Sequence, residues 1–287
     1  MCSGNTARGS RPGLGGVALL AITLLGLPFG IGCKKDTTSR APVPAPAPSP
    51  SPDSSTPPPP RPTLLIHAAV AAGNTAEVRS HIHWATDLKA RDQQQRTPLS
   101  IAAEKGDCRV AELLLDAGAG VEVTSKSQNY TPLFFAATAG QLKMARLLID
   151  RGADVDAMSK TNATPLHSAA LMGHTEIVKL LIDHGARVDS PNRRGWRPLH
   201  KAAARGHADV VELLIAKDAD VNARGEDGRT PLHWAAAAGH AEVVALLIAN
   251  GANINARNDK GQTPLNRAEA AGQREVVELL RAQGAAE

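Results

Sequence analysis

The sequence predicts an all-α repeat solenoid: pairs of short helices stacked side by side and joined by β-hairpin loops, preceded by a signal peptide and a disordered Pro-rich linker. Three observations predict it. A Thr-Pro-Leu start recurs every 33 or 34 residues from Thr97 onward, with Arg197 in place of threonine in one copy. The chain is 43% hydrophobic but only 2% aromatic, and 11 prolines lie within residues 34–62. A period of this length indicates supersecondary units that bury their apolar faces only by stacking on one another.

Residues 1–32 have the pattern of a secretory signal peptide. Arg8 and Arg11 precede a dense apolar stretch from Val17 to Leu27, and no acidic residue accompanies them. A basic segment followed by an apolar stretch of this length is typical of such signals. A transmembrane helix needs about 20 apolar residues, and Pro28 with its neighbouring glycines interrupts the second half of this region. A cleaved signal is therefore favoured over an uncleaved membrane anchor.

The next residues, Gly30-Ile31-Gly32-Cys33, resemble the bacterial lipoprotein signal. In that family, small residues precede a cysteine that is lipidated and becomes the mature N-terminus, although Gly30 stands where leucine is usual. The resemblance implies that Cys33 carries a lipid anchor in the cell envelope. Lys34 directly after it implies the periplasmic side of the outer membrane rather than the inner membrane. The alternative is that Cys33 is an incidental thiol behind an ordinary signal peptide.

Residues 33–62 form a Pro/Ala/Ser-rich tether. Its prolines exclude a helix or a strand ladder and favour polyproline II. At ~3.1 Å per residue, such a spacer reaches about 90 Å. The alternative is that the prolines are a ligand for the aromatic groove of a partner. Because the segment lies between a predicted anchor and a predicted folded domain, we favour the spacer.

Residues 63–287 consist of one unit repeated seven times. In the clearest copy, Thr230-Pro231-Leu232-His233 is followed by Gly239 and later by Gly251. The first copy, from Leu64, has a degenerate start. A glycine stands at the position of Gly239 in all seven copies: Gly73, Gly106, Gly140, Gly173, Gly206, Gly239 and Gly272.

The local chemistry of each copy predicts two helices. Thr230 is a competent N-cap, and Pro231 suits the first helical position, where its missing N–H would be unbonded anyway. The first helix is expected from Pro231 to about Ala238 and is ended by Gly239, which tolerates a positive φ. The second is expected from about Ala241 to Ala249, with its Val and Leu residues spaced along one buried face.

These motifs resemble ankyrin repeats over residues 64–287. The resemblance implies a non-catalytic scaffold whose partners are proteins bound on the concave face, which is made by hairpin tips and first helices. It also implies that the motif histidines hydrogen-bond the hairpins and connect adjacent repeats. These histidines are His67, His167, His174, His200, His207, His233 and His240.

Both ends of the array depart from the motif in the manner of capping repeats. Ser80 and His81 occupy the Leu-Leu position of the first copy, and Arg281 replaces an apolar residue in the last. We expect a wetter outer face at these repeats. Inside the array, Arg197 replaces threonine, and loss of that N-cap is expected to weaken repeat five by about 0.5–2 kcal/mol.

Charge and motif content argue against several other functions. Of 32 basic and 28 acidic residues, six and two lie in residues 1–62, which leaves 26 of each sign in the repeats. A nucleic-acid partner is therefore not expected. No catalytic or phosphate-binding motif is present, His81 and His83 are too close in sequence to share a metal on a helix, and Cys108 has no motif-placed base. We expect no enzyme activity, no metal and no cofactor.

The variable motif positions indicate where a partner binds. Because Trp, Tyr and Arg dominate interface energetics, we expect repeats three to five to contact a partner that presents carboxylates beside an apolar group. The alternative is that Arg193 and Arg194 form a solvated loop tip on which Trp196 packs; Trp234 is assigned to packing. The candidate contact residues are Tyr130, Lys160, Leu171, Met172, Arg193, Arg194, Trp196, Arg205 and Arg229.

The sequence thus predicts an exported, lipid-anchored protein-binding module of the bacterial cell envelope, expected to be a monomer. One alternative is a regulatory or protective accessory subunit of an envelope enzyme. Another is an exported protein that interacts with a host.

Overall fold

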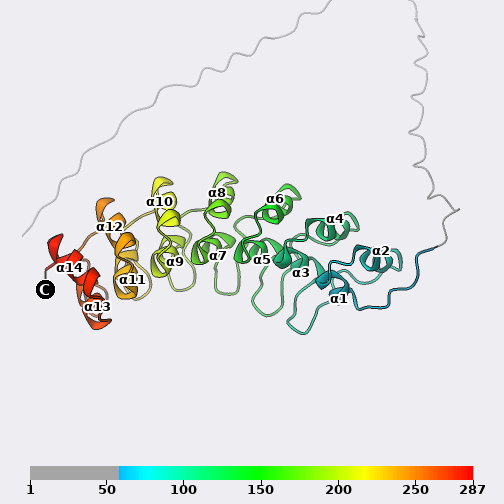
Figure 1. The fold of residues 1–287 in the computed structure, drawn as a ribbon, viewed down its shortest axis with the longest axis horizontal. Helices are drawn as coiled ribbons and strands as arrows, with labels where there is room; N and C mark the ends of the chain where they lie inside the picture. The colour runs from blue at the N-terminus through cyan, green and yellow to red at the C-terminus, as the bar shows by residue number, and fades with distance from the viewer. Residues whose placement is uncertain (1–57, 287) are drawn as a thin grey trace, which may run out of the picture. The chain divides into compact units, whose positions relative to one another are not determined.

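The computed structural model describes residues 58–286. The predicted signal peptide, Cys33 and all but the last five residues of the predicted tether lie outside the described residues. Within the described part the chain forms fourteen helices in seven consecutive pairs and no strand (Figure 1). None of these helices is long and apolar enough to cross a membrane.

Each pair consists of an odd-numbered helix followed by an even-numbered one. The odd-numbered helices are α1 (Ile66–Ala71), α3 (Pro98–Lys105), α5 (Pro132–Thr138), α7 (Pro165–Met172), α9 (Pro198–Arg205), α11 (Pro231–Ala238) and α13 (Pro264–Ala270). The even-numbered helices are α2 (Thr75–His83), α4 (Cys108–Asp116), α6 (Leu142–Asp150), α8 (Thr175–Asp183), α10 (Ala208–Ala216), α12 (Ala241–Ala249) and α14 (Arg274–Ala282). The predicted bounds of α11 and α12 are confirmed.

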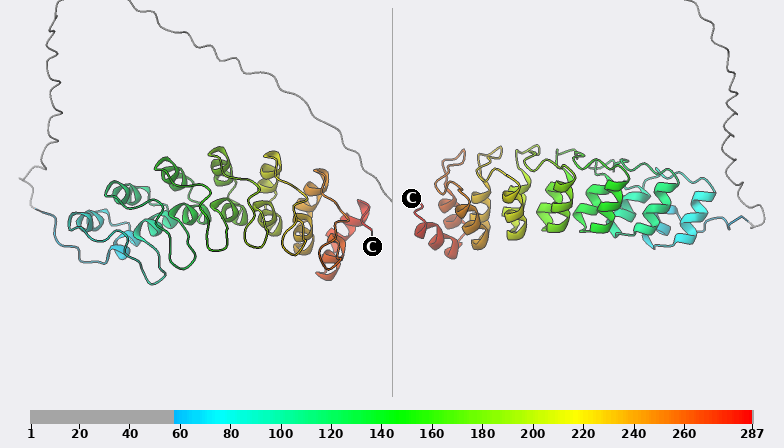
Figure 2. Two further views of the ribbon diagram at one scale, coloured as in Figure 1. Left: turned by 180° about the vertical axis from the view of Figure 1, so that it is seen from behind. Right: turned by 90° about the horizontal axis from the view of Figure 1, so that it is seen from above.

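The helices lie in two rows. Each odd-numbered helix contacts the odd-numbered helices before and after it, and the even-numbered helices do the same in a second row (Figures 1 and 2). The connecting loops extend from the row of odd-numbered helices. We call the surface made by the odd-numbered helices and the loop tips the inner face.

The helix ends follow the predicted chemistry. The hydroxyls of Thr97, Thr131 and Thr263 each accept the backbone N–H of the residue three positions on, at 3.2 Å. The seven motif glycines all have φ between 65° and 80°, a region that costs other residues about 1–2 kcal/mol. Capping and glycine placement therefore fix where the odd-numbered helices begin and end.

Arg197 compensates in part for the N-cap that repeat five lacks. Its backbone N–H donates to His200 Nδ1 at 3.2 Å. Its guanidinium forms ion pairs with Asp220 (3.3 Å) and Asp189 (3.7 Å). The predicted weakness of this repeat is thus opposed by charge pairing, which is worth little at a solvated surface.

The connecting loops are closed by turns, and not by the β-strands that the sequence suggested. Within one loop, Asn192 N–H donates to the carbonyl of Trp196 at 2.9 Å. Between neighbouring loops, Arg193 N–H donates to the carbonyl of Thr161 at 2.8 Å. One backbone bond between successive tips is too little for a strand ladder, but such a bond links each loop to the next from the loop before α5 onward.

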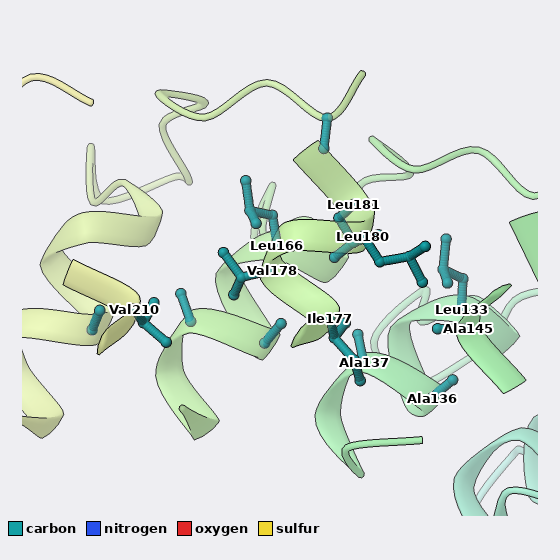
Figure 3. Packing of buried hydrophobic residues seen from close by; sticks show 14 of the residues in the cluster. Leu133, Ala136, Ala137, Ala145, Leu166, Ile177, Val178, Leu180, Leu181 and Val210 are labelled. Atoms are coloured by element: carbon teal, nitrogen blue, oxygen red, sulfur yellow. The ribbon is translucent and has the colours of Figure 1, made fainter. Parts of the chain in front are cut away.

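The core is continuous along the array and is built from motif positions. Leu133, Leu166, Leu199 and Leu232 occupy the same position in four repeats, and all are 0% exposed. The alanines beside them are small, so that odd-numbered helices can approach closely. Figure 3 shows Leu133 and Leu166 in this core together with Ile177, Val178 and Leu181 of α8. Because each repeat supplies only part of this core, its stability depends on its neighbours.

The first repeat differs from the prediction of a wetter outer face. Ser80 and His81 are only 3% and 5% exposed, because residues 58–65 pack against them. The hydroxyl of Ser80 donates to the carbonyl of Pro60, and His81 Nε2 donates to the carbonyl of Leu64 at 2.7 Å. The end of the predicted tether therefore takes the place of a preceding repeat.

The last repeat agrees with the prediction of a polar cap. The Arg281 side chain is 55% exposed and forms an ion pair with Glu269 at 2.8 Å. Its charged head lies where an interior repeat would have an apolar residue facing the next one.

Candidate functional site on the inner face

A pocket of about 540 Å³ lies on the inner face, where repeats three, four and five meet. Its lining comes mainly from α5, α7 and α9 and from the loops before them. Pockets that hold ligands usually occupy about 300–1,000 Å³ and combine an apolar lining with a few polar groups. This pocket has an apolar, aromatic lining at one end and a charged side chain at the other.

Aromatic side chains form the end at repeat three. Tyr130 stacks on Phe134, with ring centroids 4.0 Å apart and planes at 6°, and meets Phe135 edge-on at 5.9 Å. Tyr130 directly precedes the N-cap Thr131, and the two phenylalanines stand on the first turn of α5. Leu171 of α7 adds an aliphatic surface to this end.

A lysine marks the end at repeat five. Lys201 of α9 lies half-buried, with Nζ 4.2 Å from the ring centroid of Trp196. No ion pair among residues 58–286 includes Lys201. Burial lowers the pKa of its ammonium, and the positive charges of Arg194 and Arg205 lower this pKa further.

The polar groups between the two ends are held in place by hydrogen bonds. Thr138 Oγ1 lies 2.6 Å from Ser168 Oγ and donates to the carbonyl of Phe134 at 2.8 Å. The amide oxygen of Asn192 accepts the backbone N–H groups of Arg194 and Trp196. The middle of the pocket therefore has a fixed shape.

Histidines fix the loops that frame the inner face. Nδ1 of His167 accepts the backbone N–H of Thr164 at 3.2 Å, so Nε2 donates to the carbonyl of Trp196 at 3.0 Å. His200 and His233 bond the next loops in the same way. Burial lowers the pKa of His167 and His200 to about 4 and also lowers the pKa of His233. A proton on Nδ1 would replace an acceptor by a donor and break this arrangement.

Of the remaining motif histidines, His67 bonds a loop as predicted, whereas His174 and His207 bond carbonyls of helices α5 and α7 in the preceding repeat. His67 Nε2 donates to the carbonyl of Ala90 at 3.0 Å. His174 and His207 reach back one repeat, to the carbonyls of Thr138 (3.1 Å) and Leu171 (3.0 Å). His240 packs on Gly206 of the preceding repeat.

The structure places the predicted contact residues in three groups on the inner face. Tyr130, Trp196 and Arg229 stand directly before odd-numbered helices, and Leu171, Met172 and Arg205 stand at the ends of such helices. Lys160, Arg193 and Arg194 lie on loop tips. Of these nine, Tyr130 and Leu171 line the pocket. Met172, next to Leu171, is 48% exposed.

Trp196 and Arg229 also make contacts within the array. The Trp196 ring meets Trp234 of the next repeat at a centroid distance of 4.6 Å and an angle of 66°. Arg229 lies over the ring of Trp234 at 4.8 Å and forms an ion pair with Asp227 at 3.2 Å. Trp196 therefore packs more closely on the neighbouring repeat than on its own loop tip. The residue of that tip over its ring is Arg194, whose Cζ lies 5.7 Å from the ring centroid.

Other reactive groups in the described part have structural surroundings. Cys108 is half-buried at the first turn of α4, and burial with the nearby carboxylates of Glu112 and Asp107 raises the pKa of its thiol. Both ring nitrogens of His81 are occupied, by Leu64 and Thr86. Residues 58–286 contain no group of three His, Cys, Asp or Glu side chains placed to hold a metal ion.

Comparison with known proteins matches this architecture. The family described as ankyrin repeats matches in three copies, at residues 65–159, 154–225 and 222–286. This chain belongs to the ankyrin-repeat family. A segment of 58 residues is 47% identical to the protein named potassium channel KOR1 of Oryza sativa subsp. japonica. That match spans 20% of this ankyrin-repeat chain and 7% of the rice protein, so it concerns a short stretch of repeats.

The pocket residues that sequence reasoning missed include Phe134, Phe135 and Lys201. A signal for them exists in the motif. Phe134 replaces the histidine of the Thr-Pro-Leu-His start, and Phe135, Ser168 and Lys201 occupy the next position in successive repeats. Comparing that one position across the copies would have identified a line of variable residues on the inner face.

Proposed function

We propose that this chain is a non-catalytic protein-binding module whose partner binds the inner face over repeats three to five. The observation that carries the proposal is the pocket of about 540 Å³ with aromatic residues at one end and an unpaired lysine at the other. Exposed Met172 extends the apolar surface beyond the pocket. Large rigid side chains beside uncompensated charge are typical of energetically important contacts.

Affinity capture with the full chain tests this proposal. Tyr130→Ala and Met172→Glu should each reduce recovery of the native partner from solubilised envelope membranes. Lys179→Ala on α8 is the matched control, because it changes the net charge by the same amount as Met172→Glu but lies on an even-numbered helix. Equal recovery with all variants would contradict binding at this face.

We further propose that the module is exported and lipid-anchored through Cys33, on the periplasmic side of the outer membrane, with residues 34–57 as spacer. The support is the sequence pattern of residues 1–35. Metabolic labelling with a fatty-acid analogue should label the wild type and leave Cys33→Ala unlabelled. An unlabelled wild type would contradict the anchor and favour an exported protein that interacts with a host.

A regulatory or protective accessory subunit of an envelope enzyme is the second candidate. This role uses the same anchor and the same inner-face contact as the first proposal. It differs in that the partner is an enzyme whose activity the chain regulates or protects. Activity of the captured partner with and without the chain separates this role from simple tethering.

A further inference from the structure

We infer that the pocket binds an extended segment of the partner in which a large apolar side chain and a carboxylate stand two residues apart. The apolar side chain lies against the aromatic end, and the carboxylate pairs with Lys201. This inference deepens the proposed protein-binding function and rests on it.

The aromatic end selects an apolar side chain. Phe135 is half-buried and presents its edge to the ring of Tyr130, which is itself fixed by stacking on Phe134. Rigid rings lose little conformational entropy when a partner covers them. Leu171 lines the same pocket from the neighbouring repeat. An apolar side chain inserted here would therefore be shielded from water on several sides at once.

The opposite end selects a negative charge. Lys201, Arg193, Arg194 and Arg205 lie on one repeat, and within residues 58–286 none of their side chains takes part in an ion pair. Arg194 and Arg205 are close enough to lower the pKa of Lys201 by repulsion. A carboxylate placed among these cations would relieve that repulsion and gain charge-assisted hydrogen bonds.

The acidic groups near the pocket are already engaged or lie elsewhere, which gives the bound segment a direction. Glu104, at the aromatic end, forms an ion pair with Arg96. Glu226 lies by the loop tip of repeat five, beside Arg194 and Trp196 and outside the pocket lining. Lys201 lines the pocket and has no ion pair with a carboxylate of residues 58–286. The carboxylate end of the segment therefore lies toward repeat five.

The alternation of side chains along an extended chain sets the spacing in the segment. In an extended chain, side chains at positions i and i+2 point to the same side and stand about 7 Å apart. Adjacent side chains point to opposite sides, so an apolar residue directly followed by an acid cannot place both groups in one pocket. A pocket of about 540 Å³ accommodates the two groups of an i, i+2 pair.

The test uses a defined peptide, acetyl-Lys(fluorophore)-Gly-Ser-Phe-Ser-Glu-Ser-Gly-amide, and the full chain in detergent. Fluorescence anisotropy should show saturable binding. Replacing the peptide Glu by Gln, or Lys201 by Gln in the protein, should each weaken binding by about tenfold, and the two changes together should weaken it no further. A peptide with Phe and Glu adjacent should bind as weakly as the Gln peptide.

Two further variants serve as controls. Lys179→Gln makes the same chemical change on α8 and should leave binding unchanged. Lys201→Glu should reject the Glu peptide and bind a peptide with Lys in place of Glu, a gain that misfolding cannot produce. Absence of saturable binding by the wild type below about 1 mM, or equal binding of the Glu and Gln peptides, would overturn the inference.

The outcome is distinguishable from failure of the proposed function. If Tyr130→Ala abolishes capture of the native partner while the Phe-Ser-Glu peptide does not compete, the inner face binds proteins but the inferred segment chemistry is wrong. If inner-face variants leave capture of the native partner unchanged, both the protein-binding proposal and the inferred segment are wrong.

Discussion

The buried histidines predict that this fold loses stability between neutral and mildly acidic pH. His167 and His200 are 2% and 1% exposed, and burial holds the pKa of each at about 4, against 6.5 for a free side chain. Because the folded pKa lies below the unfolded one, the unfolded state binds more protons in the window between these values. The stabilisation from neutral histidines is therefore complete above about pH 6.5 and is lost as the pH falls toward 4.

The magnitude follows from the size of this window. One pKa unit corresponds to about 1.4 kcal/mol. A pH of 5 lies about 1.5 units below the pKa of the histidines in the unfolded chain. Each of the two residues then costs about 2 kcal/mol, and the pair costs about 4 kcal/mol. His233, which is 0% exposed with a lowered pKa, acts in the same direction.

Urea unfolding at pH 7 and at pH 5 measures this loss, and asparagine variants isolate its source. Asn266 occupies the same position in repeat seven and accepts the backbone N–H of Thr263 at 3.0 Å, so asparagine keeps the capping bond without titrating in this range. The variant H167N/H200N should start less stable at pH 7 but should lose about 4 kcal/mol less on acidification than the wild type.

The control is His184→Asn, at the exposed histidine that directly follows α8 as its C-cap, which should keep the wild-type pH dependence. Carboxylates such as Glu122, whose pKa burial raises, contribute equally to both proteins and cancel. If the double variant and the wild type lose the same stability between pH 7 and pH 5, the reasoning about neutral buried histidines is refuted.

Three further predictions concern other parts of the array. Gly206→Ala should destabilise the fold more than Gly251→Ala in urea unfolding. Both glycines have a positive φ, which costs alanine about 1–2 kcal/mol, but only at Gly206 would the added Cβ lie 2.6 Å from Nδ1 of His240, whereas Gly251 faces open space. Equal losses of stability would contradict this prediction. Leu214→Ala, at a 0% exposed site on α10, should lower the free energy of unfolding by about 2–5 kcal/mol, and a loss under about 1 kcal/mol would show that the neighbouring helices close the cavity. Trp84→Ala should speed amide hydrogen exchange in repeat one and leave exchange in repeats three to seven unchanged. The reason is that the indole N–H donates to the carbonyl of Pro59 at 3.2 Å and Arg61 lies over the ring. Unchanged exchange in repeat one would mean that residues 58–65 do not protect it.

Much of the fold follows from local sequence signals. The bounds of α11 and α12, the threonine N-caps and the positive φ of the motif glycines depend on interactions within about one helical turn. The histidine bonds to the loops were implied by the family motif, and the structure confirms them for His67, His167, His200 and His233. The strands expected in the loops were wrong, because successive tips share a single backbone hydrogen bond.

The candidate site was harder to predict because it depends on three repeats at once. Tyr130 and Leu171 were among the predicted contact residues, but the motif says nothing of whether a side chain is neutralised by a neighbour. Arg197 and Arg229 have carboxylate partners, whereas Lys201 does not. Whether a charge is paired depends on side-chain rotamers and on the distances that they set, neither of which is encoded in the repeat pattern.

By itself, the sequence determined the number of repeats, the ends of their helices and the leucine positions of the core. These features recur with the period, and each is decided by backbone geometry and burial within one unit. Only the tertiary structure decided that residues 58–65 cover Ser80 and His81, and that Phe135, Leu171 and Lys201 line one pocket. The physical reason is that stacking brings equivalent positions of successive repeats side by side, so that residues about 33 apart in sequence form one surface.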